Sequence, residues 1–272
     1  MNDTASGNQG SLWKKHLEKI CLFCAKPIPA KAFPFLLLAV TAAGFFLRLL
    51  ENNLNGDLDR DSVLYINIAS GYINDSSYPG VMLPFLTVMM KYLYFLGIPL
   101  ETGGLLISLL TGTLLIPLVY GILAQFCPRK EIPLAGALLT AFHPTLLQLS
   151  AQIMRDPSYL FFCACAILLF LLAVKKRKEK SSDLFWGILG GILALGCCCR
   201  YETVELIFLP GFYGIYAFAA QKEKKSVILR KMGILLIVFL LILFLFLYVN
   251  GLGNELYELY IGRILRIWQE HK

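Results

Sequence analysis

Seven long apolar runs constrain the fold of this chain more than any other feature of its sequence. They cover residues 33–50, 103–126, 132–149, 158–174, 184–199, 204–220 and 232–250. About 20 consecutive apolar residues are enough for a helix to cross the hydrocarbon core of a bilayer. Only 16% of the residues are charged, whereas about 25% is usual for soluble domains. The sequence therefore predicts an all-α polytopic membrane protein with about seven transmembrane helices.

Basic residues gather in the short connections between these runs. The groups are Lys14, Lys15 and Lys19; Arg129 and Lys130; Lys175, Lys176, Arg177 and Lys178; and Lys222, Lys224 and Lys225. If each run crosses the membrane once, all four groups fall on one side, which the positive-inside rule identifies as the cytoplasm. The net charge of +7 thus reflects topology, and we expect no nucleic-acid partner.

This topology divides the chain into three predicted regions. Residues 1–32 form a cytoplasmic segment, residues 33–250 a transmembrane domain with an outer loop at 51–102, and residues 251–272 an amphipathic tail on the outer face. Residues 81–96 are apolar, but counting them as a span would move the later basic groups outside. We therefore expect them to form a helix at the outer interface.

Three charged clusters are predicted to meet on the outer side. The first contains Asp57, Asp59, Arg60 and Asp61, with Tyr65 one turn later; the second is Arg155 with Asp156; the third is Arg200, Tyr201 and Glu202. Arginine binds phosphate in a bidentate manner, and carboxylates serve as general bases and hard-metal ligands. Charge at the edge of a membrane is costly unless it is solvated, paired or used on a ligand. Together the clusters suit an anionic substrate carried on a lipid.

Three of these residues also have a purely structural interpretation. Asp61 has the position of a helix N-cap, and Asp156 before Pro157 is typical of an N-cap followed by proline at the first helical position. Arg200 is placed to neutralise the C-terminal end of the fifth span. When each residue is considered by itself, the sequence does not distinguish these structural roles from a functional one.

Three features inside the spans predict packing rather than chemistry. Arg48, near the end of the first run, is expected to extend its side chain to the interface. His143 is expected to pack or to hydrogen-bond backbone groups freed by Pro144. Gly187, Gly190 and Gly191 form a small-residue face that predicts close helix packing in the fifth span.

The order and spacing of several segments resemble those of the GT-C membrane glycosyltransferases, in particular the Rgt-type and dolichyl-phosphate-mannose protein mannosyltransferase-like group. The resemblance extends from about residue 45 to about residue 210. Its landmarks are residues 47–49, 60–69, 78–80, 83–86, 109–117, 143–144, 155–156 and 190–202.

This resemblance implies a function and assigns roles to individual residues. Such enzymes move a sugar from a polyprenyl-phosphate carrier to an envelope glycan, lipid or protein acceptor at the outer membrane face. Their essential carboxylate matches Asp61 best and Asp59 second, and a further acidic position matches Asp156. Arg200 matches a phosphate ligand. The remaining predicted substrate-binding residues are Arg60, Tyr65, Lys91, Arg155 and Glu202.

The resemblance leaves open whether the protein holds a metal ion and whether the chain is part of a longer protein. A divalent cation, Mg²⁺ or Mn²⁺, would be held by Asp59 and Asp61. Family members usually carry more spans, so the chain is expected to be a fragment, one half of a split protein or a reduced member. A non-catalytic partner subunit, or a carrier for lipid-linked sugars, is the competing interpretation. In either case we expect a multi-pass protein of the bacterial inner membrane, in contact with membrane lipids, with its site outside.

Overall fold

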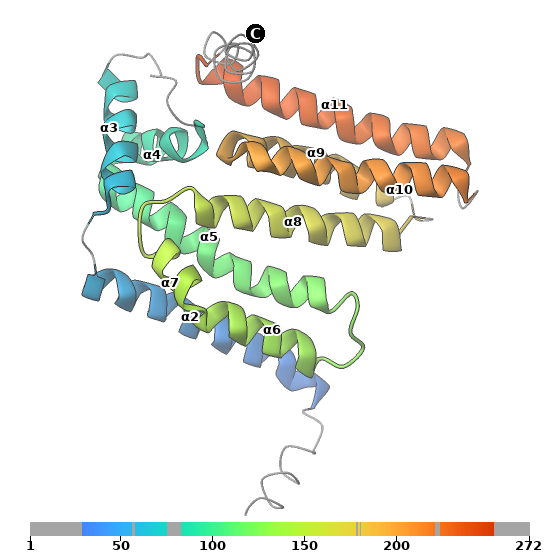
Figure 1. Ribbon diagram of the computed structural model, residues 1–272, viewed down its shortest axis with the longest axis horizontal. Helices are drawn as coiled ribbons and strands as arrows, with labels where there is room; N and C mark the ends of the chain where they lie inside the picture. The colour runs from blue at the N-terminus through green and yellow to red at the C-terminus, as the bar shows by residue number, and fades with distance from the viewer. Residues whose placement is uncertain are drawn as a thin grey trace, which may run out of the picture.

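A computed structural model describes residues 29–55, 58–74, 83–177, 179, 181–220 and 224–252, and every regular element within them is a helix (Figure 1). The elements are η1 (Ala30–Ala32), α2 (Phe33–Asn55), α3 (Arg60–Asn74), α4 (Phe85–Phe95), α5 (Leu100–Leu123), α6 (Glu131–Phe142), α7 (Pro144–Ser150), α8 (Asp156–Lys175), α9 (Ser182–Cys199), η2 (Tyr201–Ile207), α10 (Phe208–Ala219) and α11 (Lys225–Val249). The prediction of an all-α membrane protein is confirmed. Asp57 and most of the predicted amphipathic tail lie outside the described residues.

Five described helices are long and apolar enough to cross a membrane singly, rather than the seven expected. They are α2, α5, α8, α9 and α11. A sixth span results if α6 and α7 are counted together, although they meet at a bend of 56°. The region expected to form the remaining span is divided into the 3₁₀ helix η2 and the 12-residue α10. Pro210 explains this division, because it has no N–H to bond the carbonyl four residues earlier.

The long helices lie side by side; α5 and α8 run in the same direction, as do α9 and α11, whereas α8 and α9 are antiparallel (Figure 1). Helix α5 contacts α2, α6 and α8, and α9 lies between α8 and α11. Helices α3 and α4 stand across one end of this arrangement (Figure 1). The first residues of α8 and the last residues of α9 reach the same end, so the topology alone brings the three predicted clusters together.

The basic residues lie at the opposite end. Lys130 precedes α6, Lys175 ends α8 and Lys225 begins α11, and these three helix ends are far from α3 and α4 (Figure 1). These basic connections are therefore separated along the spans from the three charged clusters, as the topology predicts. The assignment of one end to the cytoplasm stays a prediction.

Helix α4 does not cross the membrane by itself. Its 11 residues extend about 16 Å at 1.5 Å per residue, which is short of the roughly 30 Å of the hydrocarbon core. Leu86, Val88 and Met90 are buried, and α4 packs against α3 and α5. It is thus built into the charged end of the fold and is more enclosed than a helix lying on the interface.

The glycine-rich face of α9 packs closely against α11, as predicted. A Cβ atom on Gly190 would collide with the main-chain carbonyl of Leu235. Gly187 and Gly191 instead have room for a methyl group, because their nearest neighbours are side-chain atoms at 3.6 Å and 3.8 Å. Close approach of the two helices therefore depends on Gly190.

Arg48 does not reach the interface, contrary to the prediction, because α6 breaks beside it. Pro144 has no N–H for the carbonyl of Thr140, which an unbroken helix would bond. The fully buried Arg48 donates through Nη2 to that carbonyl at 3.4 Å and through Nη1 to the carbonyl of Ala141 at 3.5 Å. His143, expected to pack or to bond freed backbone groups, has an exposed side chain.

Candidate functional site

The segment at 151–154, which leads into α8, is held in place by side chains from three other helices. Asn52 of α2, Ser62 of α3 and Ser108 of α5 each hydrogen-bond a main-chain group of this segment, at 2.8 Å, 3.4 Å and 3.1 Å. Ser108 also accepts a hydrogen bond from the segment at 3.1 Å. A buried polar backbone requires such partners. These bonds set the position at which Arg155 and Asp156 enter α8.

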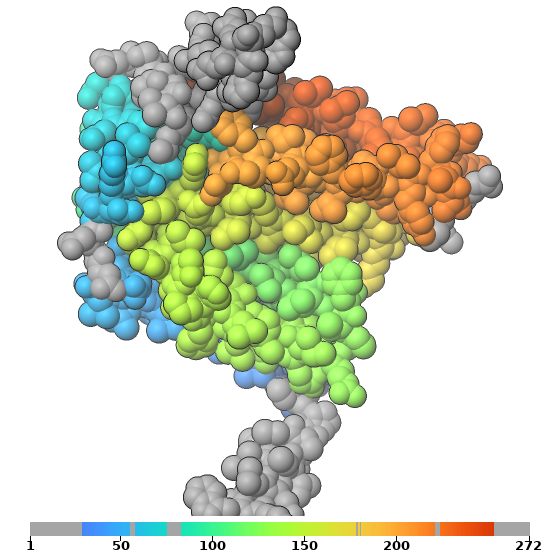
Figure 2. All heavy atoms as spheres, in the orientation of Figure 1, coloured from blue at the N-terminus to red at the C-terminus, as the bar shows by residue number. Residues whose placement is uncertain are grey.

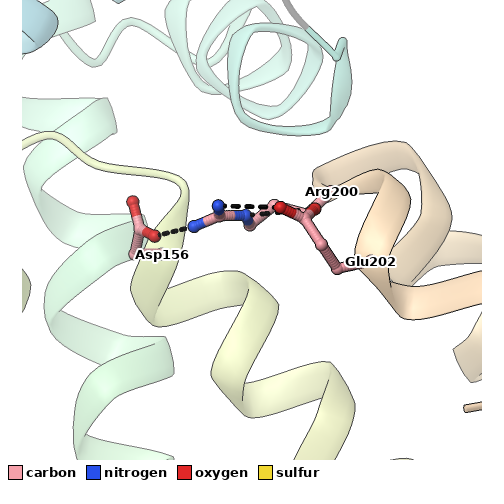
Figure 3. Close-up of polar contacts among 3 residues, drawn as sticks. All are labelled: Asp156, Arg200 and Glu202. Carbon is pink, nitrogen blue, oxygen red and sulfur yellow. Dashed lines mark hydrogen bonds and ion pairs between the residues drawn. The ribbon is translucent and has the colours of Figure 1, made fainter. Parts of the chain in front are cut away.

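Arg200 joins the end of α9 to the start of α8 (Figure 3). Its Nη1 forms an ion pair with Oδ1 of Asp156. Its Nη2 and Nε donate to the two carboxylate oxygens of Glu202, at 2.9 Å and 3.3 Å. The guanidinium carbon also lies 5.2 Å from the centre of the Tyr159 ring, within the range of a cation–π contact. We refer to Asp156, Arg200 and Glu202 as the arginine cluster.

Arg200 and Glu202 stabilise each other's charged forms. The hydrogen bond from Arg200 lowers the pKa of Glu202 below its ordinary value, and the same bond raises the pKa of Arg200. Hydrogen bonding to the charged form of a group favours that form. The side chains remain partly open to solvent, with 28% of Arg200 and 46% of Glu202 exposed, so an incoming anion can reach the guanidinium.

Arg155 differs from Arg200 although it lies close by. It is half-buried, and within the described part of the chain it forms no ion pair. A guanidinium without a carboxylate partner keeps its full charge and all its donors for a ligand. Of the two arginines, Arg155 therefore has more hydrogen-bond donors available for a ligand than Arg200.

The three charged clusters converge on Tyr65. Burial raises the pKa of Tyr65 to about 12; among the nearby charges, Arg155 and Arg200 lower this pKa, whereas Asp156 and Asp61 raise it. All three clusters thus lie close enough to act on one hydroxyl group. The ring itself is only 2% exposed and packs in the core, so it presents no open face on which a sugar could stack.

Asp59 and Asp61 have different surroundings. Asp59 precedes α3, and its carboxylate accepts the Arg60 N–H at 2.7 Å while its carbonyl accepts the Val63 N–H at 3.1 Å. Asp59 therefore supports the start of the helix, a role that the sequence assigned to Asp61. Asp61 lies exposed in the first turn, one turn before Tyr65, and remains available for chemistry.

The described residues do not build a divalent-cation site. No group of three His, Cys, Asp or Glu side chains comes together among them, whereas Mg²⁺ and similar hard ions prefer several oxygen ligands. Asp59 is engaged by the main chain, and Asp156 by Arg200. We therefore derive no step through the predicted cation.

Lys91 points to a different part of the fold. Its Nζ lies 3.6 Å from the centre of the Tyr72 ring, and burial lowers its pKa. This cation–π contact between α4 and α3 ties the two helices together. Arg60, which was also predicted to bind substrate, is exposed at the first position of α3.

Two polar pockets border the segment at 151–154, and the sequence did not reveal them. The larger has a volume of about 780 Å³ and is lined by residues that include Glu51, Asp59, Gln148 and Gln152. The smaller, of about 310 Å³, shares Gln152 and adds residues that include Glu101. Helix α7 and the residues next to it lie on the face seen in Figure 2, beside α2 and α3. Of these lining residues, the sequence analysis had identified only Asp59. The polar residues that follow the end of an apolar run were the one sequence signal that could have indicated the pockets.

Comparison with known protein families identifies the family of this chain. Residues 105–257 match the family described as dolichyl-phosphate-mannose-protein mannosyltransferase, which is more than half of the 272 residues. The match includes Arg155 and the arginine cluster, but it begins after Asp59 and Asp61. No curated protein matches the chain. With its membrane-spanning helices and this match, the chain belongs to the dolichyl-phosphate-mannose-protein mannosyltransferase family.

Proposed function

We propose that this protein transfers a sugar from a polyprenyl-phosphate carrier to an acceptor hydroxyl, at the membrane end formed by α3, α4 and the start of α8. The ion pair of Arg200 with Asp156 at the start of α8 carries this proposal. Arg155 directly precedes this helix. Helix α3, which bears Asp61, contacts the segment leading into α8 through Ser62. A carboxylate and two guanidinium groups at the end of a membrane bundle suit a lipid-linked phosphate. The separation of the basic connections from this end supports an outward-facing site.

The arginines would bind the phosphate of the donor. Arg155 has no carboxylate partner in the described chain, so it is the first candidate for direct contact. Arg200 would contribute by exchanging part of its bond with the more exposed Glu202. Guanidinium groups match phosphate oxygens in a bidentate manner, and fixed positive charge stabilises the leaving group as negative charge develops on it.

Asp61 would act as the general base. In this step the acceptor hydroxyl loses its proton to the Asp61 carboxylate, and its oxygen forms a bond to the anomeric carbon of the sugar. The bond from that carbon to the phosphate oxygen breaks, and the polyprenyl phosphate leaves with the electron pair. Attack opposite to the leaving group inverts the anomeric configuration. Asp59 is the alternative base, because it lies two residues away and borders the larger pocket.

Transfer from a radiolabelled polyprenyl-phosphate sugar to the acceptors of isolated envelope membranes tests the base. We expect Asp61→Asn to lower the transfer rate by about 10²- to 10⁴-fold, the usual contribution of a general base. Asp59→Asn should lower it much less. Asn67→Ala, on the exposed side of α3, is the matched control and should leave the rate unchanged. Undiminished transfer by Asp61→Asn, with a lost rate in Asp59→Asn, would move the base to Asp59.

A further inference from the structure

We propose that the two polar pockets bordering Gln152 form the acceptor site, and that this site takes a hydroxyl-rich ligand without negative charge, such as a neutral sugar or an amino sugar. This inference rests on the proposed function, whose donor is the polyprenyl phosphate. The two pockets share Leu58, Ala151 and Gln152. A ligand longer than one sugar ring can therefore contact both.

The lining of the pockets suits hydroxyl groups. Gln148 and Gln152 each supply amide donors and an acceptor, and Glu51, Asp59 and Glu101 supply carboxylate oxygens. Sugar hydroxyls can donate to these carboxylates and exchange hydrogen bonds with the amides. A cationic amino group would gain further from the carboxylates.

The same lining disfavours an anion. In the described part of the chain, neither Lys nor Arg lines either pocket. A phosphate or a uronic acid would face the carboxylates of Asp59 and Glu101, and like charges at close range repel. The arginines that could compensate an anion belong to the other side of the site.

The structure thus separates the two substrates by charge. Arg155 and the arginine cluster line neither pocket, whereas Asp59 borders the larger one. Residues 58–65 connect the two sides, because Asp59 borders the pocket and Tyr65 is surrounded by the charges of the clusters. Asp61 lies between these two positions in the chain, where a base has to meet both substrates.

The acceptor site is also held rigidly. Gln152 belongs to the segment whose main chain is fixed by Asn52, Ser62 and Ser108. The main chain that bears Gln152 therefore has one position before the ligand arrives. Preorganisation of this kind lowers the entropy lost on binding.

Saturation-transfer difference NMR on the full chain in detergent tests the acceptor site directly. The probes are mannobiose, a neutral disaccharide; the glucosamine disaccharide, which is cationic; and the galacturonate disaccharide, which is anionic. We expect saturation transfer to the first two probes. We expect transfer to the galacturonate disaccharide to be at least about fivefold weaker, the loss that corresponds to about 1 kcal/mol.

Two variants and one control assign the signal to the pockets. Gln152→Leu and Gln148→Leu should each weaken transfer to mannobiose by about fivefold, because each removes one amide hydrogen bond worth about 1 kcal/mol. Gln148 is exposed on α7, so its replacement leaves the fold intact even if that of Gln152 does not. Asn67→Ala, at an exposed position of α3 that lines neither pocket, should leave the mannobiose signal unchanged.

Equal binding of the anionic probe, or an unchanged mannobiose signal in both glutamine variants, would overturn the acceptor site. This readout does not depend on turnover. A protein that binds mannobiose through Gln148 and Gln152 but transfers no sugar would keep the acceptor site and reject the proposed function. A protein that transfers sugar with both glutamines replaced, at unchanged acceptor KM, would do the reverse.

Discussion

Arg48 and Arg200 show two different uses of the same side chain. Arg48 is fully buried between α2 and the broken end of α6, where it donates to main-chain carbonyls. Arg200 lies partly exposed at the end of α9 and pairs with two carboxylates. Carbonyls freed by a proline cannot find another donor inside a membrane, whereas exposed carboxylates can return to water. An arginine bound to backbone therefore maintains the fold, and only one bound to carboxylates can release them for a phosphate.

Removing Arg48 should produce the largest loss of stability. Arg48→Met leaves the carbonyls of Thr140 and Ala141 without their donor, and an unsatisfied buried acceptor costs about 1–3 kcal/mol. We expect a loss of several kcal/mol, measured as a marked fall in the thermal unfolding midpoint in detergent.

The proline that creates this need provides the control. Pro144→Ala restores an N–H that can bond the carbonyl of Thr140. The cost of Arg48→Met should then fall by at least about 1 kcal/mol in the Pro144→Ala background, as a double-mutant cycle would reveal. Strict additivity of the two substitutions would show that Arg48 stabilises the bundle in another way.

The packing of α9 should affect the arginine cluster next most strongly. Gly190→Ala forces a methyl group against the Leu235 carbonyl, and overpacking of this kind costs about 1–3 kcal/mol. Because α9 carries Arg200, its displacement should lower both the unfolding midpoint and the transfer rate. Gly187→Ala, where the nearest atom is 3.6 Å away, should change neither. Equal behaviour of the two variants would contradict the close contact.

Arg155 should contribute more to binding of the sugar donor than to the stability of the fold. Arg155→Gln is expected to weaken binding of polyprenyl phosphate by about tenfold or more, the loss of one charge-assisted hydrogen bond, with little change in unfolding. Native mass spectrometry of the purified protein with added polyprenyl phosphate measures this occupancy. Arg200→Gln should reduce occupancy and stability together, because it leaves two carboxylates unpaired. Full occupancy in both variants would place the phosphate elsewhere.

The smallest effect should be the response of the arginine cluster to pH. Since the pKa of Glu202 lies below its ordinary value of 4.5, its contribution to stability is present above that value. It is lost as the pH falls through the lowered pKa. With 46% of the side chain exposed, this contribution should not exceed about 1 kcal/mol. The unfolding midpoints of wild type and Glu202→Gln should differ at pH 7 and converge once the pH falls below the lowered pKa of Glu202; a constant difference would rule out the ion pair as its cause.

The sequence predicted the large-scale fold because the relevant signals are local. Apolar length identified five spans that are single helices, but the runs at 132–149 and 204–220 are each broken into two helices. The distribution of Lys and Arg predicted which connections share a side. The same information placed Asp61, Arg155 and Arg200 at one end, because each lies just beyond an apolar run on the side away from the basic connections. It also separated α4 from the spans, since a further crossing would have broken the pattern of charge.

The details of the site depend on contacts between distant segments, which one sequence does not display. Nothing near Arg48 in the chain shows that α6 breaks beside it. Likewise the burial of Tyr65 depends on the packing of α4 and the segment at 151–154 around it. The pockets form where Glu51 and Gln148, almost 100 positions apart in the chain, face the same space. Sequence reasoning found the charged groups but not the cavities between them.

The contact of Asn250 with α3 and α4 has a consequence for biogenesis. Tyr72 of α3 donates to the Asn250 carbonyl, and Tyr92 of α4 donates to its Oδ1 at 3.0 Å. These partners lie 178 and 158 positions apart in the chain, so α3 and α4 emerge from the ribosome long before the residue that secures them. Helices α3 and α4 therefore gain these hydrogen bonds only after the end of α11 has been synthesised. A nascent chain halted before that point would lack them.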